Sequence, residues 1–97
     1  MNNLTFQKTS IDGLQIIERH PLNDERGFLE RIFCQETLKF LLKEKTIRQI
    51  NHTFTGKEGS VRGLHFQYPP YAETKIVTCL KGKVWDVAVD LRKGSKT

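Results

Sequence analysis

The stretch from Ser60 to Gln67 places one arginine, one histidine and one glutamine among apolar residues. His65 is open to two interpretations. It is either a hydrogen-bonded histidine of the core, which is the commoner role of a single histidine, or a proton-transfer group in a pocket. The second interpretation has a physical basis, because an unperturbed imidazole titrates closer to neutral pH than any other side chain. These eight residues alone do not decide between the two.

Arg62 and His65 have opposite parity, so a regular strand would place their side chains on opposite faces of a sheet. Gly63 lies between them. A glycine inside a strand often marks a bulge, and a bulge would let both side chains reach one cavity. The sequence therefore predicts an irregular strand at Gly63.

Two further expected strands carry polar side chains that could face a ligand. In the segment 46–54, Gln49 and Asn51 share one face and can donate and accept hydrogen bonds, either to a polar ligand or to solvent. The segments 73–80 and 83–90 alternate like a hairpin around a two-residue turn at Lys81 and Gly82. In that register Lys75 is diagonal to Asp86 among small apolar residues, which favours a lined cavity over open solvent.

The first half of the chain predicts fewer regular elements. We expect a polar arm at 1–13, a strand at 14–17 and a turn at 21–24. A strand over 28–34 would place Glu30 on an otherwise apolar face. Leucines at helical spacing predict one short amphipathic helix over 36–45.

Composition limits the class of protein. The chain has 97 residues, which allows at most one domain, and its 37% hydrophobic content is low for a self-sufficient core. The net charge of +5 favours anionic ligands, although a solvated basic surface explains most of it. Nucleic acid is disfavoured as a partner because the basic residues are spread along the chain.

Cys34 and Cys79 lack metal-ligand spacing and are expected to be buried thiols of a reduced compartment. Without a signal peptide or a long apolar run, the chain is expected to be soluble and cytoplasmic, with no membrane contact.

Several of these segments together resemble the N-terminal half of a dTDP-4-dehydrorhamnose 3,5-epimerase. The resemblance is specific because its motifs follow one another in order from about Pro21 to the last residue, whereas each motif alone is weak. The matching segments are 24–28, 49–52, 61–67, 75–77 and 85–95.

The resemblance implies an all-β, cupin-like jelly roll, here a partial barrel with one short helix, in a single domain spanning 1–97. It further implies a homodimer that binds a nucleotide-linked 4-keto-6-deoxy sugar without cofactor or metal. The sequence agrees with the expectation that no metal is bound, because its three histidines lack the His-x-His pair and further ligands of a metal cupin.

The resemblance also implies roles for individual residues. His65 matches the base that removes a proton next to the ketone, and Lys75 matches a cation beside the carbonyl oxygen. The residues that would hold the sugar and its diphosphate are Arg26, Glu30, Gln49, Asn51 and Arg62. Asp86 is expected beside the site rather than on the substrate.

Two departures from the family pattern restrict what the resemblance implies. Glu30 follows Arg26 by four residues, whereas the best-known members have one residue more, and a one-residue change reverses the face of a strand. Those enzymes are also about twice as long, and their second half supplies the tyrosine that returns the proton. Three hypotheses follow: a shortened epimerase, a half-barrel that binds a sugar nucleotide or is completed by another polypeptide, and a structural module that dimerises.

Overall fold

The computed structural model describes residues 3–97, which form two separate units. The first unit joins the N-terminal part of the chain, up to Arg48, to the segment Ala88–Thr97. The second unit is the intervening segment, Gln49–Val87. Among residues 3–97, no helix is long and apolar enough to cross a membrane.

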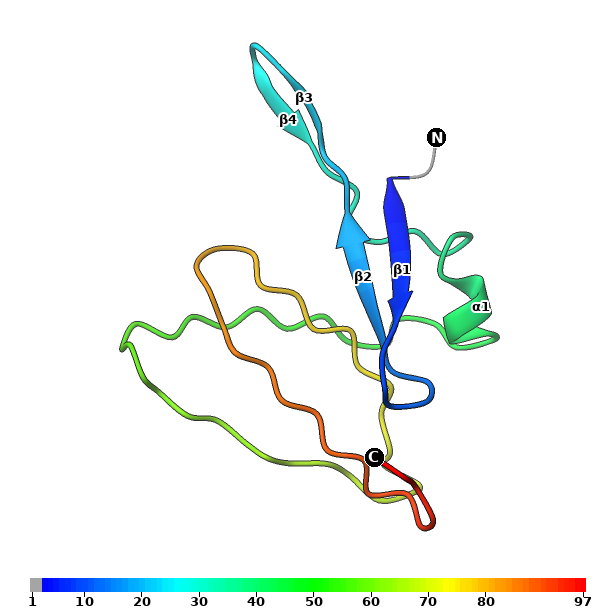
Figure 1. The fold of residues 1–97 in the computed structure, drawn as a ribbon. Coiled ribbons are helices and arrows are strands. Elements are labelled where there is room, and N and C mark those ends of the chain that lie inside the picture. The colour runs from blue at the N-terminus through cyan, green and yellow to red at the C-terminus, as the bar shows by residue number, and fades with distance from the viewer. Residues whose placement is uncertain (1–2) are drawn as a thin grey trace. The chain divides into compact units, whose positions relative to one another are not determined.

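Strands β1 (Leu4–Lys8) and β2 (Gln15–Arg19) form an antiparallel pair, seen side by side in Figure 1. Leu4 pairs with Arg19 and Phe6 with Ile17, and these four residues are buried or half-buried. Their neighbours on the opposite face are exposed, as expected for a sheet with one covered face. The prediction of a polar arm is therefore wrong for β1, because apolar residues at alternate positions suffice for a strand. Residues 1 and 2 of that arm lie outside the described part of the chain.

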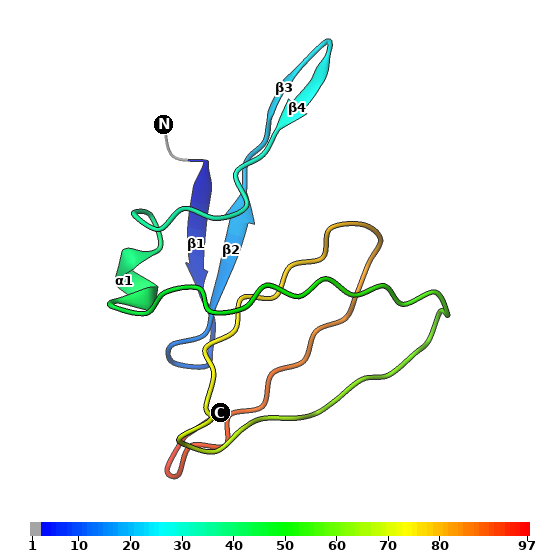
Figure 2. The ribbon, with the colours of Figure 1, turned by 180° about the vertical axis from the view of Figure 1, so that it is seen from behind.

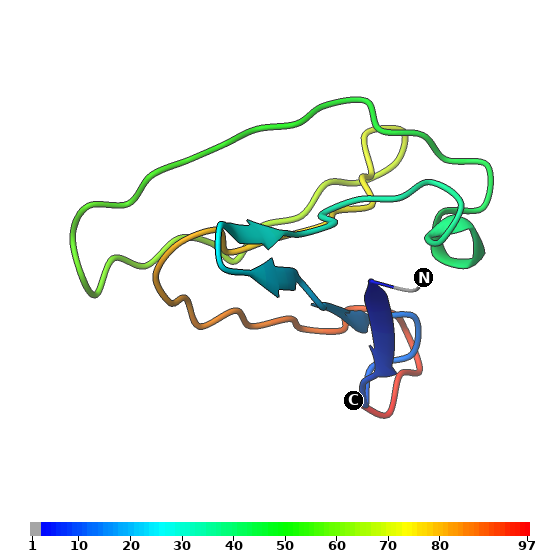
Figure 3. The ribbon, with the colours of Figure 1, turned by 90° about the horizontal axis from the view of Figure 1, so that it is seen from above.

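Strands β3 (Leu22–Asp24) and β4 (Gly27–Leu29) form a second antiparallel hairpin (Figure 3). The predicted turn at 21–24 is wrong, because the chain reverses after Asp24. The Asp24 carboxylate accepts a hydrogen bond from the Arg26 backbone N–H at 2.8 Å, and Gly27 has a φ of 145°. Local side-chain bonding of this kind favours a turn over a continued strand. The strand predicted over 28–34 ends at Leu29.

The predicted helix is present but shorter than expected. Helix α1 covers Lys39–Leu42 and ends where Lys43 takes a φ of 56°. It lies beside β1 in the view from behind (Figure 2), and Phe40 contacts Phe6 edge to face with ring centroids 4.8 Å apart. The buried apolar core consists of Leu4, Leu38 and Leu42.

The second unit contains no helix and no strand (Figures 1 and 2). The strands predicted over 46–54, 60–67, 73–80 and 83–90 therefore do not pair here, although the chain bends as predicted at Lys81 and Gly82. An isolated two-stranded hairpin is at best marginally stable without a packed face, and this unit buries no apolar side chain. The structure is consistent with the all-β class, while the jelly roll and the single domain remain predictions.

The two cysteines are free and half-buried, so the prediction of buried thiols is wrong. Cys79 lies in the second unit, which has no core to cover it. Cys34 lies in the turn before α1, where a side-chain hydrogen bond with Thr37 lowers the pKa of its thiol.

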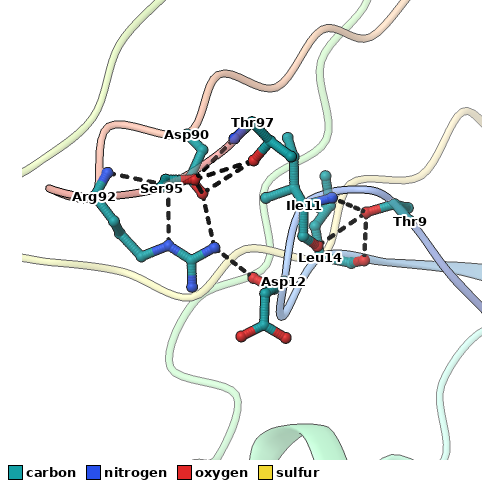
Figure 4. A network of polar contacts seen from close by, with 8 residues as sticks. All are labelled: Thr9, Ile11, Asp12, Leu14, Asp90, Arg92, Ser95 and Thr97. Carbon is teal, nitrogen blue, oxygen red and sulfur yellow. Dashed lines mark hydrogen bonds and ion pairs between the residues drawn. The ribbon is translucent and has the colours of Figure 1, made fainter.

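A polar network attaches the C-terminal segment to the loop between β1 and β2 (Figure 4). The Asp90 carboxylate accepts hydrogen bonds from the Arg92 guanidinium at 2.9 and 2.8 Å and from the Ser95 hydroxyl at 2.5 Å. Arg92 also donates to the backbone carbonyl of Asp12 at 2.7 Å. Residues from the two ends of the chain are thereby joined within the first unit.

The hydrogen bonds from Arg92, and then that from Ser95, hold the pKa of Asp90 well below its ordinary value of 3.8. As the pH falls, the unfolded chain therefore takes up a proton at this carboxyl before the folded chain does. The stabilisation by Asp90 is fully present above about pH 4 and is lost as the pH falls toward the folded pKa.

We expect Asp90→Asn to lower the thermal stability of the first unit at pH 7 and to change it progressively less below about pH 4. Thermal unfolding followed by circular dichroism from pH 7 to pH 2.5 would measure this. Asp12→Asn is the matched control, because the hydrogen bond from Arg92 goes to the backbone carbonyl of Asp12 and the carboxylate interacts with Arg92 through its charge alone. Equal pH profiles for the two variants would contradict the prediction.

Leu38 is 1% exposed and lies in the three-leucine core of the first unit. We expect Leu38→Ala to destabilise this unit by about 2–5 kcal/mol, because it removes buried methyl groups and leaves a cavity. Amide hydrogen exchange of β1 and β2 would report the loss of protection. Leu80→Ala, at a position that is 57% exposed, should change protection by less than about 0.5 kcal/mol. Similar effects of the two substitutions would show that the three leucines do not form the stabilising core.

Candidate functional site

The candidate site residues are divided between the two units. Arg26 and Glu30 belong to the first unit, and all the others belong to the second. Across residues 3–97, no hydrogen bond or ion pair in the structure joins any two of the eight. The members in the second unit have exposed side chains: Gln49, Asn51, Arg62, His65, Lys75 and Asp86.

His65 lies against Gly63. A β-carbon added to Gly63 would lie 3.4 Å from Nδ1 and 3.8 Å from Cε1 of the imidazole, so the ring occupies the space that a larger residue would fill. Gly63 has a φ of 97°, in the region that favours glycine. Because the segment around Gly63 forms no strand here, the bulge expected at this position stays a prediction. With His65 exposed, the second unit offers no core contact to its ring.

Lys75 has an acidic neighbour that the sequence analysis did not single out. The Lys75 ammonium lies 4.0 Å from a carboxylate oxygen of Glu73. With its amide nitrogen turned toward Glu73, Gln67 donates to the two carboxylate oxygens at 3.0 and 3.2 Å. The signal for this cluster was present, because Glu73 and Lys75 are two residues apart and share a face of an extended chain. A substrate oxygen approaching Lys75 would compete with Glu73 for the ammonium group.

Arg26 lies at the tip of the hairpin formed by β3 and β4. Its guanidinium donates to Asp24 at 2.7 Å, and this hydrogen bond lowers the pKa of the Asp24 carboxyl and raises that of Arg26. An open hollow of about 460 Å³ is lined by both residues and by the apolar side chains of the hairpin. The Arg26 side chain is 86% exposed, so an anion can reach its guanidinium.

Glu30 follows β4 and faces Arg19 of β2. Its carboxylate lies 3.5 Å from the Arg19 guanidinium, and both side chains are about one-quarter exposed. In this arrangement Glu30 links two segments of the first unit. A role for Glu30 as a ligand would require this ion pair to open.

No group of three or more histidine, cysteine, aspartate or glutamate side chains within residues 3–97 is arranged to hold a metal ion. The chemistry that these side chains offer is proton transfer at an imidazole, charge stabilisation by an ammonium group and anion binding by guanidinium groups. An enolisable substrate with an anionic group would use all three.

Comparison with known proteins decides the family. A sequence model of dTDP-4-dehydrorhamnose 3,5-epimerase matches residues 8–97. The chain belongs to this family. The curated relatives include the epimerase of Shigella flexneri, 44% identical over 91 residues, or 93% of this chain and 50% of the relative. Those of Sinorhizobium fredii and Methanothermobacter thermautotrophicus are 35% and 39% identical over all 97 residues, which cover 50% and 51% of their lengths.

The chain therefore spans about half the length of the curated relatives that it matches. No solved structure matches it. The family match begins at Lys8 and includes every candidate site residue. Membership confirms the resemblance, while the roles of the individual residues remain proposals.

Two glycines of the second unit provide a matched test of the contact between the His65 ring and Gly63. Gly63 and Gly59 both have positive φ, at 97° and 81°, so alanine is strained at either position. Only at Gly63 would the added carbon meet the imidazole. We expect Gly63→Ala to move the ring-proton NMR resonances of His65, and Gly59→Ala to leave them unchanged. Unchanged His65 resonances in both variants would contradict the close packing of the ring on Gly63.

Proposed function

We propose that this chain supplies the proton-abstracting half of an active site for a dTDP-linked 4-keto-6-deoxy sugar. The single observation that carries the proposal is the family match over residues 8–97, which includes the histidine, lysine and arginines of the candidate site. The reaction is epimerisation next to a ketone, in the biosynthesis of rhamnose-type deoxysugars for cell-surface polysaccharide. The complete site includes the half of the family polypeptide that this chain does not match.

His65 is the base in this proposal, and Lys75 stabilises the charge that forms. Removing a proton from the carbon next to a ketone leaves an enolate, whose negative charge collects on the carbonyl oxygen. An ammonium group fixed beside that oxygen lowers the barrier, and removing such a group commonly costs roughly two to three orders of magnitude in rate. Glu73, which lies 4.0 Å from Lys75, would restrain the ammonium until substrate binds.

The remaining site residues bind substrate. Arg26 and Arg62 are suited to the diphosphate, because a guanidinium can make two parallel hydrogen bonds to phosphate oxygens. Glu30, Gln49 and Asn51 supply acceptors and donors for the sugar hydroxyls. Asp86 supports the position of Lys75 from beside the site.

The same family membership supports the other parts of the proposal. The complete protein folds as a cupin-like jelly roll, acts as a homodimer in the cytoplasm, and needs neither metal nor cofactor. It does not bind nucleic acid or membranes.

A second candidate function is binding without turnover, by a half-barrel that dimerises. The observation that favours it is the exposure of the candidate base and its neighbours, because general acid–base chemistry gains from a site that excludes water. Retention of sugar-nucleotide binding without proton exchange would distinguish this function from catalysis.

Solvent deuterium incorporation into dTDP-4-keto-6-deoxyglucose, followed by mass spectrometry, tests the proposal. We expect His65→Asn to lower the exchange rate by roughly 100-fold or more, because it removes the general base. The matched control is His52→Asn, which changes another exposed histidine of the same unit. Both variants should keep the circular dichroism spectrum of the unmodified chain.

Exchange that is unaffected by His65→Asn would refute the assignment of the base. Binding of the sugar nucleotide without exchange by the unmodified chain would favour the second candidate function.

A further inference from the structure

The chain turns at 68–71, and this turn has contacts of its own. The backbone N–H of Tyr71 donates to the carbonyl of Tyr68 at 2.8 Å. Two prolines stand inside the turn, and their rings restrict the backbone to few conformations. The ring of Tyr68 also contacts that of Phe66 edge to face, with centroids 4.9 Å apart. These contacts are local, so they depend on no other part of the chain.

A side-chain bridge joins the two residues that flank this turn. With its amide nitrogen turned toward Glu73, Gln67 donates to the two carboxylate oxygens at 3.0 and 3.2 Å. The chemistry requires this orientation, because a carboxylate only accepts hydrogen bonds and the amide oxygen has no proton to donate. The Glu73 carboxylate also lies 4.0 Å from the Lys75 ammonium. It therefore contacts an amide across the turn and a cation on its own side of the turn.

The bridge determines which residues on the two sides of the turn are opposite each other. Gln67 and Glu73 stand three positions before and after Pro70, and His65 and Lys75 stand two positions further out. In an extended chain, residues two apart share a face, so this register would place His65 and Lys75 on the face of the bridge. A register shifted by one residue would turn one of them to the opposite face.

The bridge also restricts the position of the ammonium group. A lysine side chain is long and flexible, and it loses conformational freedom when its ammonium is held. Glu73 and Lys75 are each 47% exposed, so their ion pair is weak and opens readily. Gln67 holds the same carboxylate from across the turn. It thereby limits the positions of Glu73, and with them the positions to which the ammonium is attracted.

We propose that Gln67 and Glu73 are positioning residues that hold the Lys75 ammonium in place across the turn from the base. This inference rests on the function proposed for His65 and Lys75. It adds two residues that act through Lys75 and do not touch the reacting atoms. When a substrate oxygen takes up the ammonium, Gln67 keeps the Glu73 carboxylate where it was, so the ammonium stays close to one position.

NMR of the 97-residue chain tests the bridge without relying on activity. We expect a nuclear Overhauser effect between the side-chain amide protons of Gln67 and the γ-protons of Glu73. Gln67→Ala removes the donor, so it should move the ε-methylene resonances of Lys75 through the released carboxylate. Glu58→Gln is the control, because it changes an exposed carboxylate of the same unit. It should leave the Lys75 resonances in place.

Deuterium exchange into the keto sugar distinguishes positioning from a structural role. Glu73→Gln leaves an amide oxygen as the acceptor for Gln67 and removes the charge that attracts Lys75. We expect it to lower kcat roughly two- to fivefold, the effect of a half-exposed ion pair. KM should not rise, because Glu73 competes with substrate for the ammonium. Glu58→Gln should leave both constants unchanged.

A double variant separates the bridge from the charge. Gln67→Glu together with Glu73→Gln exchanges the amide and the carboxylate across the turn. The amide again donates to a carboxylate, so the Overhauser effect across the turn should return. The carboxylate is then no longer two residues from Lys75. We therefore expect kcat to stay lowered in the double variant.

An unmodified chain that lacks the Overhauser effect would overturn the positioning proposal, as would Lys75 resonances that do not respond to Gln67→Ala. In a chain that exchanges deuterium, an unchanged kcat in Glu73→Gln, a raised KM, or full recovery of kcat in the double variant would refute positioning and leave the proposed function standing. A chain without exchange would refute the proposed catalysis, and the NMR results alone then decide the bridge.

Discussion

The structure depends above all on how little apolar surface this chain can bury by itself. Its core consists of three leucines contributed by β1, α1 and the turn before the helix. Strands β1 and β2 and helix α1 lie around that core, whereas the hairpin of β3 and β4 forms with all of its side chains exposed. Residues 49–87, which bury no apolar side chain, contain no regular structure. The hydrophobic effect acts here as a constraint on which local preferences become structure, because backbone hydrogen bonds alone contribute little net stability.

This constraint explains which elements could be predicted from the sequence. The helix and the strand β2 follow from apolar spacing, and both are present. Strand β1 is not predicted because Leu4 and Phe6 are its only large apolar residues, a weak pattern that becomes a strand by pairing with β2. The predicted hairpin over 73–90 has the stronger pattern and yet remains unpaired. Its alternating apolar and polar residues fit a strand whose faces are covered by other parts of a complete fold. A single segment cannot provide that cover.

In the candidate site too, some features depend on neighbouring residues and others depend on contacts between distant parts of the chain. The positions of His65, Lys75 and the arginines along the chain identify the family. The imidazole of His65 lies against Gly63 because glycine has no β-carbon, and this contact follows from local backbone geometry. Glu73 lies close to Lys75 in the sequence, whereas Arg19 appears as the partner of Glu30 only in three dimensions. Bringing His65, Lys75 and the two arginines together would require long-range contacts. No sequence spacing within 49–87 specifies these contacts by itself.

The network around Asp90 has a consequence for the entropy of the chain. By attaching Arg92 to the backbone of Asp12, it keeps the two ends of the segment Gln49–Val87 tied to one folded unit. The segment is thus a closed loop and not a free tail. Closing a loop of this length costs about 3 kcal/mol of conformational free energy, which the contacts of the first unit already offset. Ordering the segment would therefore restrain a chain whose ends are already fixed, so it would lose less conformational entropy than a free tail of the same length.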